Sequence, residues 1–305
     1  NAVWSVLGPH LRRVPDGETG ERSNWILFQY PRLAGHPAFE LDPTVPPFRL
    51  ETEKGGLVGE VPLLRLKAGV DPAGVTLDLG YAEAAKSYVH LAGLKRTGRV
   101  RPDVRFQVSL PTTAAITCCF ISPGSRPAFA EIYERALLGE LAMIAHAIPH
   151  PDLAIQWDIA VEVFVWEGRE PYTYWLPDGK QAMLAQFGRL GAAVPEAVEL
   201  GYHLCYGDPG GHHVIEPKDT RVLVEMANGI ATSVRRPIQW LHLPVPVERT
   251  DDAYYAPLDG LRLHPETKLV LGLVHDGAGA ATNAARIAAA SRHVHGFGIA
   301  TECGW

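Results

Sequence analysis

The hydrophobic and polar positions of this chain follow an alternating plan from about residue 100 onward. Short runs rich in apolar and β-branched residues alternate with longer segments in which apolar residues recur every three or four positions. The short runs predict buried strands. They are Val104–Leu110, Leu153–Val161, Val198–Tyr206, Ile238–Val245, Lys268–Val274 and Gly296–Thr301. Strands that alternate with helices form βα units, in which the strands lie parallel in one sheet.

The longer segments between these runs predict helices. The clearest is the segment that begins at Pro127, because its apolar residues fall on one face and proline is favoured where a helix starts. Asp219 and Thr220 are suited to cap the start of another helix. The predicted helices are Pro127–Ile148, Gly179–Ala193, Asp219–Ala231 and Thr282–Arg292.

Two earlier runs, Trp4–Leu7 and Leu63–Leu66, add two predicted strands to these six. Eight βα strands close a (β/α)8 barrel, also called a TIM barrel. The proline-rich region Tyr30–Pro62 is interpreted as a long insertion near the N-terminus, so we predict one barrel domain over residues 1–305. A doubly wound open sheet is the alternative, but no glycine-rich dinucleotide fingerprint follows an early strand.

Composition narrows the class of protein. The chain has 305 residues, 47% of them hydrophobic, and a formal net charge of −6. This apolar content excludes a disordered chain, and no apolar run approaches the ~20 residues of a membrane span. The absence of a basic run argues against nucleic acid as a partner. We expect no membrane partner, and a homo-oligomer remains open.

Cysteine usage indicates the compartment. Four cysteines in 305 residues are too few for a disulfide scaffold, and the adjacent Cys118 and Cys119 are poorly placed to bridge each other. The N-terminal residues lack the basic and apolar regions of a signal peptide. We therefore expect a cytoplasmic protein whose thiols are reduced and available for metal binding or catalysis.

Histidine and cysteine occur together where two predicted strands end. His203 and Cys205 are two positions apart, so their side chains point to the same face of a strand. Cys303 follows the last strand, and the carboxyl ends of barrel strands converge at one mouth. Imidazole and thiolate groups together suit zinc. The alternative is that these cysteines are small packing residues of the core.

The segments GYHLCYGD (201–208), ATECGW (300–305) and IQWDIAVE (155–162) resemble the catalytic barrel of cobalamin-independent methionine synthases and their wider family. The resemblance covers roughly residues 100–305. It implies that His203, Cys205 and Cys303 bind zinc, which activates a thiol for alkyl transfer. His242 stands where those enzymes carry a glutamate ligand, so it is either a fourth ligand or a pocket residue.

Other positions depart from the methionine synthase pattern. Asp158 matches an aspartate of that family, but the acidic residue beside it is missing, and the histidine that acts as an acid has no clear match near His275. The motif VPDGETGERSNW (14–25) resembles short relatives whose reaction is not defined. These departures leave methionine synthesis itself open, while the zinc site remains the expectation.

Further candidates lie on the loops that should face the barrel mouth. Asp158, His275 and Tyr255 are predicted to be catalytic, since they can exchange protons with a substrate or leaving group. The predicted substrate-binding residues are Asp16, Glu18, Arg22, Thr112 and Tyr254. Asp16, Glu18 and Arg22 follow the first strand, and the alternative for them is an exposed turn with local ion pairs. Thr112 belongs to a Pro-Thr-Thr sequence like that of the synthases.

The sequence thus predicts a zinc-dependent transferase in which the metal activates a thiol for alkylation, with a small thiol and an alkyl donor as partners. Opening of an epoxide by a thiol, and a C–S lyase or dealkylase, are alternatives on the same zinc site. Two alternatives belong to other classes. One is a metal-free decarboxylase of the uroporphyrinogen decarboxylase type, and the other is a non-catalytic zinc-binding barrel, whose site would be closed by four protein ligands.

Overall fold

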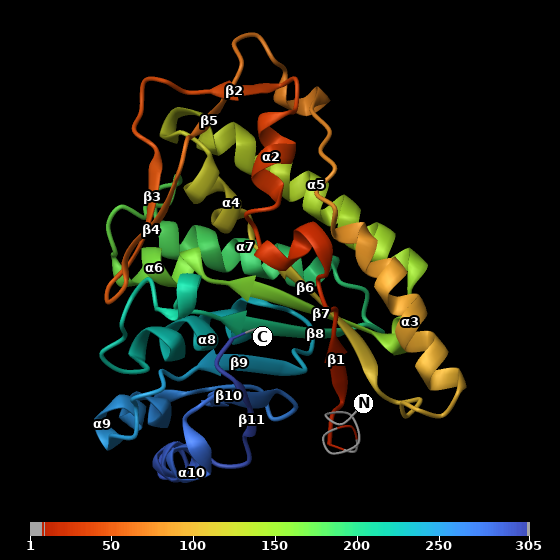
Figure 1. The fold of residues 1–305 in the computed structure, drawn as a ribbon, viewed down its shortest axis with the longest axis vertical. Coiled ribbons are helices and arrows are strands. Elements are labelled where there is room, and N and C mark those ends of the chain that lie inside the picture. The colour runs from red at the N-terminus through yellow and green to blue at the C-terminus, as the bar shows by residue number, and fades with distance from the viewer. Residues whose placement is uncertain (1–7, 9, 304–305) are drawn as a thin grey trace.

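The computed structural model describes residue 8 and residues 10–303. Its central feature is a curled sheet of parallel strands (Figure 1). Within the described residues the sheet has seven strands in the order β1-β6-β7-β8-β9-β10-β11. Their bounds are β1 Arg13–Pro15, β6 Arg105–Pro111, β7 Leu153–Ile159, β8 Glu199–Leu204, β9 Trp240–Pro244, β10 Lys268–Val274 and β11 Gly298–Thr301.

Helices connect consecutive strands from β6 onward, which confirms the predicted βα units. Each connection returns the chain to the start of the next parallel strand. The connecting helices are α4 Thr113–Phe120 and α5 Arg126–Ala147, α6 Val161–Glu167 and α7 Gly179–Ala193, α8 Arg221–Ser233, α9 Asp252–Tyr255, and α10 Gly279–Ala290. The prediction placed α5, α7, α8 and α10 within three residues of these bounds and missed the short helices α4, α6 and α9.

The proline-rich insertion carries structure of its own above the sheet (Figure 1). Two small antiparallel sheets lie in this insertion and in the residues directly after it. One pairs β2 (Phe39–Leu41) with β5 (Leu64–Leu66), and the other pairs β3 (Phe48–Thr52) with β4 (Gly56–Val61). The insertion also contains α2 (Gln29–Ala34) and is followed by α3 (Ala84–Arg96).

One predicted barrel strand is therefore wrong. Leu63–Leu66 does form a strand, but its backbone pairs with β2 and it is no part of the large parallel sheet. A short apolar run in the sequence predicts a buried strand. It does not predict which neighbouring strand forms the backbone hydrogen bonds with it. Among the described residues, the first strand of the large sheet is β1, which pairs with β6. The predicted strand Trp4–Leu7 lies outside the described residues, and closure into an eight-stranded barrel remains a prediction.

The register of the sheet aligns polar side chains on one of its faces. Asp158 of β7 pairs with His203 of β8, which pairs with His242 of β9. Partners in adjacent parallel strands point to the same face, so these three side chains form a row. The neighbouring row, Trp157, Tyr202 and Leu241, points to the opposite face and is buried. The alternation thus separates a polar row from the apolar core.

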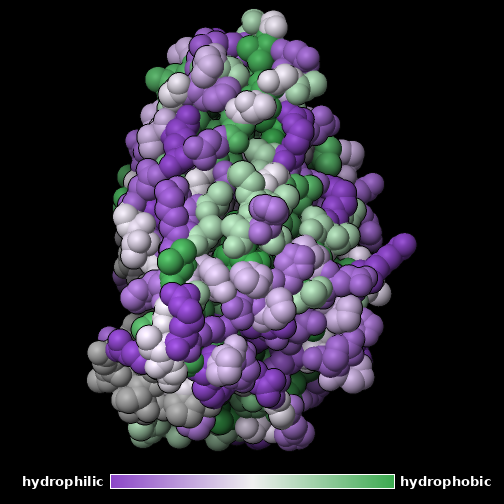
Figure 2. Space-filling model, turned by 90° about the vertical axis from the view of Figure 1, so that its right-hand side faces the viewer, coloured by the Kyte–Doolittle hydropathy of each residue, from purple (hydrophilic) through white to green (hydrophobic). Residues whose placement is uncertain are grey.

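The surface of the molecule mixes polar and apolar residues. Figure 2 shows a largely hydrophilic face with an apolar patch near its middle. None of the described helices combines the length and the apolar character that a membrane crossing requires.

Candidate metal centre

Three ligand-type side chains meet at the carboxyl end of the sheet. Cys303 Sγ lies 3.6 Å from Cys205 Sγ and 3.7 Å from His203 Nε2. One donor atom from each of the three residues lies within 4.8 Å of the other two. The structure therefore brings together the three residues that the sequence analysis expected to meet, although 98 residues separate the two cysteines.

Glycine residues allow these ligands to approach one another. Gly207 follows Cys205 in a left-handed conformation (φ +68°), and its amide donates to Cys205 Sγ over 3.3 Å. On β10, a Cβ at Gly272 would lie only 2.6 Å from the Cα of Glu302. The missing side chain of Gly272 therefore lets the end of β11, and with it Cys303, pack against the sheet.

Burial and the close contacts determine the electrostatics of the three groups. The hydrogen bond with Cys303 and burial both raise the pKa of Cys205 well above its usual value. Burial of His203 opposes its charged form and is the largest single effect, but the contact with Cys303 and the nearby Asp158 and Glu302 together outweigh it and raise the pKa. Without a metal, Cys205 therefore retains its proton, and a bound cation would have to displace it.

The donor set fits a zinc ion. Zinc in proteins is bound tetrahedrally by thiolates at ~2.3 Å and imidazoles at ~2.0 Å, which places neighbouring donor atoms about 3.5–3.8 Å apart. The two distances from Cys303 Sγ, 3.6 and 3.7 Å, fall in this range. Three protein donors also leave one tetrahedral position for a substrate, as catalytic zinc sites do.

His242 lies beside this group without belonging to it. Its ring stacks on that of His203, with 4.6 Å between the ring centroids. Burial first, and the neighbouring His203 second, lower the pKa of His242 well below its usual value, so the ring is neutral. Its Nε2 atom is buried and has no hydrogen-bond partner among the described residues. His242 thus has an unused nitrogen close to the three ligands.

Carboxylates from two other strands border the same region. Asp158 accepts a hydrogen bond from Gln156 Nε2 over 2.9 Å, and burial raises its pKa to about 6, against the attraction of His203. Burial and then the charge of Asp158 raise the pKa of Glu18 to about 7. Asp16 forms a buried ion pair with Arg22 over 2.6 Å. The loop after β1 is therefore no simple exposed turn, and it places Glu18 near Asp158.

A second cluster adjoins Cys303 on the chain. The carboxylate of Glu302 lies 3.0 Å from His213 Nε2 and 3.6 Å from His275 Nδ1. His275 Nε2 also contacts the carbonyl oxygen of Val245 over 2.8 Å. His275, which was predicted to be catalytic, therefore contacts Glu302, the residue that precedes the candidate ligand Cys303. The sequence analysis assigned no role to Glu302, and only its position before Cys303 could have suggested one.

Three other predicted residues lie apart from the ligand group. The hydroxyl of Tyr255 donates to the carbonyl of Arg249 over 2.8 Å, and Tyr254 contacts the hydroxyl of Tyr206 over 3.5 Å. Both tyrosines are fully buried. Thr112 is buried at the start of α4 beside the carboxyl of Glu162. None of these three side chains has a contact with the three ligands among those found in the described residues.

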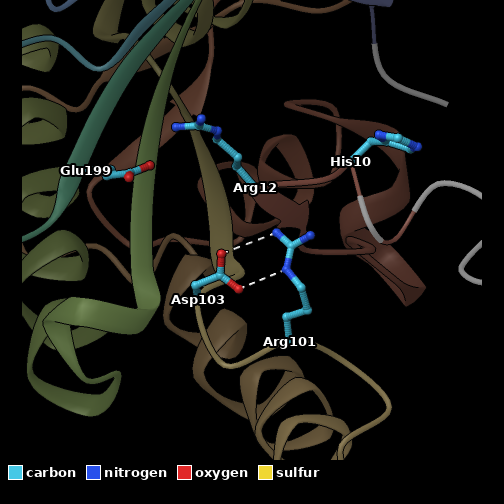
Figure 3. Close-up of a pocket in the computed structure, with 5 residues that line it drawn as sticks. All are labelled: His10, Arg12, Arg101, Asp103 and Glu199. Carbon is cyan, nitrogen blue, oxygen red and sulfur yellow. Dashed lines mark hydrogen bonds and ion pairs between the residues drawn. The ribbon is translucent and has the colours of Figure 1, made fainter.

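A polar cavity of about 480 Å3 lies at the other end of the sheet (Figure 3). His10, Arg12, Arg101, Asp103 and Glu199 line it. Glu199 begins β8, whereas the candidate ligands His203, Cys205 and Cys303 lie at or just beyond the carboxyl ends of their strands. In barrel-type folds the carboxyl ends carry the active site. This cavity is therefore separate from the candidate metal centre.

Comparisons of the sequence and of the structure with known proteins define the fold class. No protein-family model matches the chain, and no curated protein matches it in sequence. A solved structure does match: a proposed vitamin-B12-independent methionine synthase from Listeria monocytogenes, with 15% identity and a TM-score of 0.53. The match covers 99% of this chain and 77% of that protein. At this identity it shows that the two chains share an α/β fold.

The weaker structural matches do not support any further statement about the fold. The EAL enzyme Bd1971, in a form with cAMP and cyclic-di-GMP bound, is 8% identical with a TM-score of 0.31 and covers 83% of this chain and 59% of that protein. A likeness of this size carries no argument. The fold is thus similar to that of a proposed methionine synthase, and the metal centre is argued from its own geometry.

Proposed function

We propose that this chain is a zinc-dependent enzyme that transfers an alkyl group to or from a small thiol. The observation that carries this proposal is the meeting of His203, Cys205 and Cys303, whose donor atoms lie within 4.8 Å of one another with both distances from Cys303 Sγ in the tetrahedral range. The match to a proposed methionine synthase supports it at the level of fold. The proposal includes closure of the sheet into a (β/α)8 barrel, in which these strand ends would form one mouth.

His203, Cys205 and Cys303 would hold the zinc, with His242 as a candidate fourth ligand or pocket wall. When bound there, zinc supplies the positive charge that keeps a substrate thiol deprotonated, and only the thiolate is a nucleophile. Burial of His203 and Cys205 limits the access of water to this side of the site, whereas Cys303 is partly exposed.

Residues around the ligands supply the remaining groups. Asp158 and Glu18 can accept a proton or bind a polar part of the thiol, because both have pKa values raised toward neutrality. His275 is the proposed proton donor for the leaving group of the alkyl donor. Asp16 and Arg22 hold the loop that carries Glu18. Thr112, Tyr254 and Tyr255 are fully buried, and any substrate contact by them would require local movement.

Variants of this reaction fit the same site. Opening of an epoxide by a thiol, and cleavage of a C–S bond by a lyase or dealkylase, use the same activated sulfur. A metal-free decarboxylase would need neither cysteine. A non-catalytic zinc-binding barrel would bind the metal but would have all four positions occupied by protein.

Metal analysis tests the proposal. We expect the purified protein to contain one zinc per chain and Cys205→Ser and Cys303→Ser to lose it. Cys119→Ala is the matched control, because Cys119 is buried but lies outside the ligand group. A wild-type protein without stoichiometric zinc, or serine variants that retain it, would contradict the proposal.

Addition of thiols then separates an enzyme from a zinc-binding protein. The zinc-edge absorption spectrum should change when a substrate thiol takes the open position. An unchanged spectrum across a panel of thiols would favour a closed, non-catalytic site. A decarboxylation activity that survives removal of the metal would favour the decarboxylase.

A further inference from the structure

The strand that carries Cys303 is held weakly by its backbone. Within the described residues β11 pairs only with β10, and the register between them shifts between Leu271 and Val274. Cys303 lies beyond the last paired residue, Thr301. A metal ligand in such a place needs other contacts to fix its sulfur within a few tenths of an ångström.

Side chains provide those contacts. The hydroxyl of Thr301 donates to the carbonyl of Cys303 over 2.7 Å. The neighbouring Glu302 is only 16% exposed, and its Oε1 atom lies 3.0 Å from His213 Nε2, an electrostatic contact without hydrogen-bond geometry, while its Oε2 atom lies 3.6 Å from His275 Nδ1. The contact with His213 is the shorter of the two contacts. His213 therefore holds the residue next to the ligand.

His213 is itself held from two directions. Its Nδ1 lies 3.5 Å from the carboxylate of Glu216. Its carbonyl accepts a hydrogen bond from the backbone amide of Glu53, and the side chain of Glu53 accepts one from the amide of Glu216 over 2.9 Å. Glu53 also pairs with Arg169 over 2.8 Å. The turn between β3 and β4 thus fixes the loop that carries His213.

We propose that His213 is a positioning residue of the metal centre, which acts through Glu302 to hold Cys303 and links the metal centre to the β3–β4 hairpin of the insertion. This inference rests on the proposed function for its metal, but the placement of Cys303 can be measured without one. Outer contacts of this kind typically change metal affinity by about 10–100-fold when they are removed.

The first test measures zinc affinity by competition with a chelator. His213→Leu removes the ring nitrogen that lies beside Glu302 Oε1 and should weaken zinc binding about tenfold or more. His213→Gln keeps an N–H donor at that end of the side chain and should restore most of the affinity. His212→Leu is the matched control, because His212 is exposed and lies outside the contacts of Glu302. Equal affinity in His213→Leu and the wild type would overturn the proposal.

The second test uses the metal-free protein. The rate at which iodoacetamide alkylates Cys303, followed by mass spectrometry, should rise several-fold in His213→Leu and stay near the wild-type rate in His213→Gln. An unchanged rate in His213→Leu contradicts the inference even where zinc binds. If the wild type binds no zinc, the proposed function fails, while this comparison still decides whether His213 positions Cys303.

The third test examines the link to the insertion without altering the histidine. Glu53→Ala removes the contacts with Glu216 and Arg169. The alkylation rate of Cys303 should therefore rise in this variant, but by less than it rises in His213→Leu. Glu51→Ala is the control, because Glu51 lies on the same hairpin but pairs with the exposed Arg49. If both hairpin variants behave alike, the hairpin does not position the ligand. Circular dichroism of each variant verifies that the fold is retained.

Discussion

The sulfur atoms of Cys205 and Cys303 lie 3.6 Å apart, one just beyond β8 and the other just beyond β11. The contact joins two strands that are not neighbours in the sheet, since β9 and β10 lie between them. Only the curl of the sheet brings their ends together (Figure 1). The two thiols therefore report directly on whether the sheet has its native curvature.

Mild oxidation of the metal-free protein should join Cys205 to Cys303. A disulfide has an S–S bond of about 2.05 Å, so the two side chains need to move by little more than 1.5 Å in total. Cys118 and Cys119, which are buried away from this pair, should stay reduced and serve as internal controls. Peptide mapping by mass spectrometry identifies the product. Bound zinc should slow the reaction, and a mixture of cysteine pairings would contradict the geometry.

Replacement of Arg22 should destabilise the protein strongly. Arg22→Ala leaves Asp16 as a buried charge without its partner, which typically costs about 3–5 kcal/mol of the free energy of unfolding. Arg49→Ala breaks an ion pair with Glu60 whose side chains are about half exposed, and should cost less than about 1 kcal/mol. Urea denaturation measures both losses. Equal losses would show that the Asp16–Arg22 pair is not buried.

An added methyl group at Gly201 should not be accommodated. A Cβ there would lie 1.9 Å from the ring of Trp240, and that ring is fixed by Gln156 over 3.0 Å and by the guanidinium of Arg13 at 3.9 Å. Gly201→Ala should therefore cost about 1–3 kcal/mol or more. Gly59→Ala, where the new atom meets nothing within 4 Å, is the control. A Gly201→Ala protein with wild-type stability would refute the packing described for β8 and β9.

Glu162 should make stability depend on pH. Burial raises the pKa of Glu162 from 4.5 to about 7. Below pH 4.5 the carboxyl is protonated in both the folded and the unfolded chain, so its contribution is fully present. As the pH rises to 7 only the unfolded chain ionises readily, and stability falls until the folded carboxyl also ionises.

Glu162→Gln removes this titration. Between pH 5 and pH 8 the wild type should lose about 2–3 kcal/mol more of its free energy of unfolding than the variant. Urea denaturation at the two pH values measures the difference. Glu131→Gln, at an exposed position, should follow the wild type. A parallel pH dependence in wild type and Glu162→Gln would show that the carboxyl is not protonated in the folded state.

The sheet was largely predictable from the sequence because its strands are short apolar runs. Lys268–Val274 coincides with β10, and the other runs from residue 100 onward differ from their strands by up to two residues at each end. The first strand, β1, was missed because Arg13–Pro15 has no apolar run of its own and is a strand only through its pairing with β6. Local pattern cannot reveal a pairing that the neighbouring strand supplies.

The candidate metal centre was predictable to a similar extent. The two-residue spacing of His203 and Cys205 predicted that their side chains lie on one face of a strand. The place of Cys303 after the last predicted strand put it at the same end of the sheet. The contact of His213 with Glu302 could not be predicted, since it depends on the path of the loop after β8 and on the β3–β4 hairpin that holds it. Side chains on loops meet through tertiary contacts that no periodicity encodes.

The order of the ligands along the chain has a consequence for synthesis. A ribosome adds about 5–20 residues per second, so Cys303 would emerge roughly 5–20 s after Cys205, from which 98 residues separate it. During that interval only His203 and Cys205 are available, and two donors bind zinc weakly. If the three residues hold zinc as proposed, all three donors would be available to the metal only after residue 303 has been synthesised.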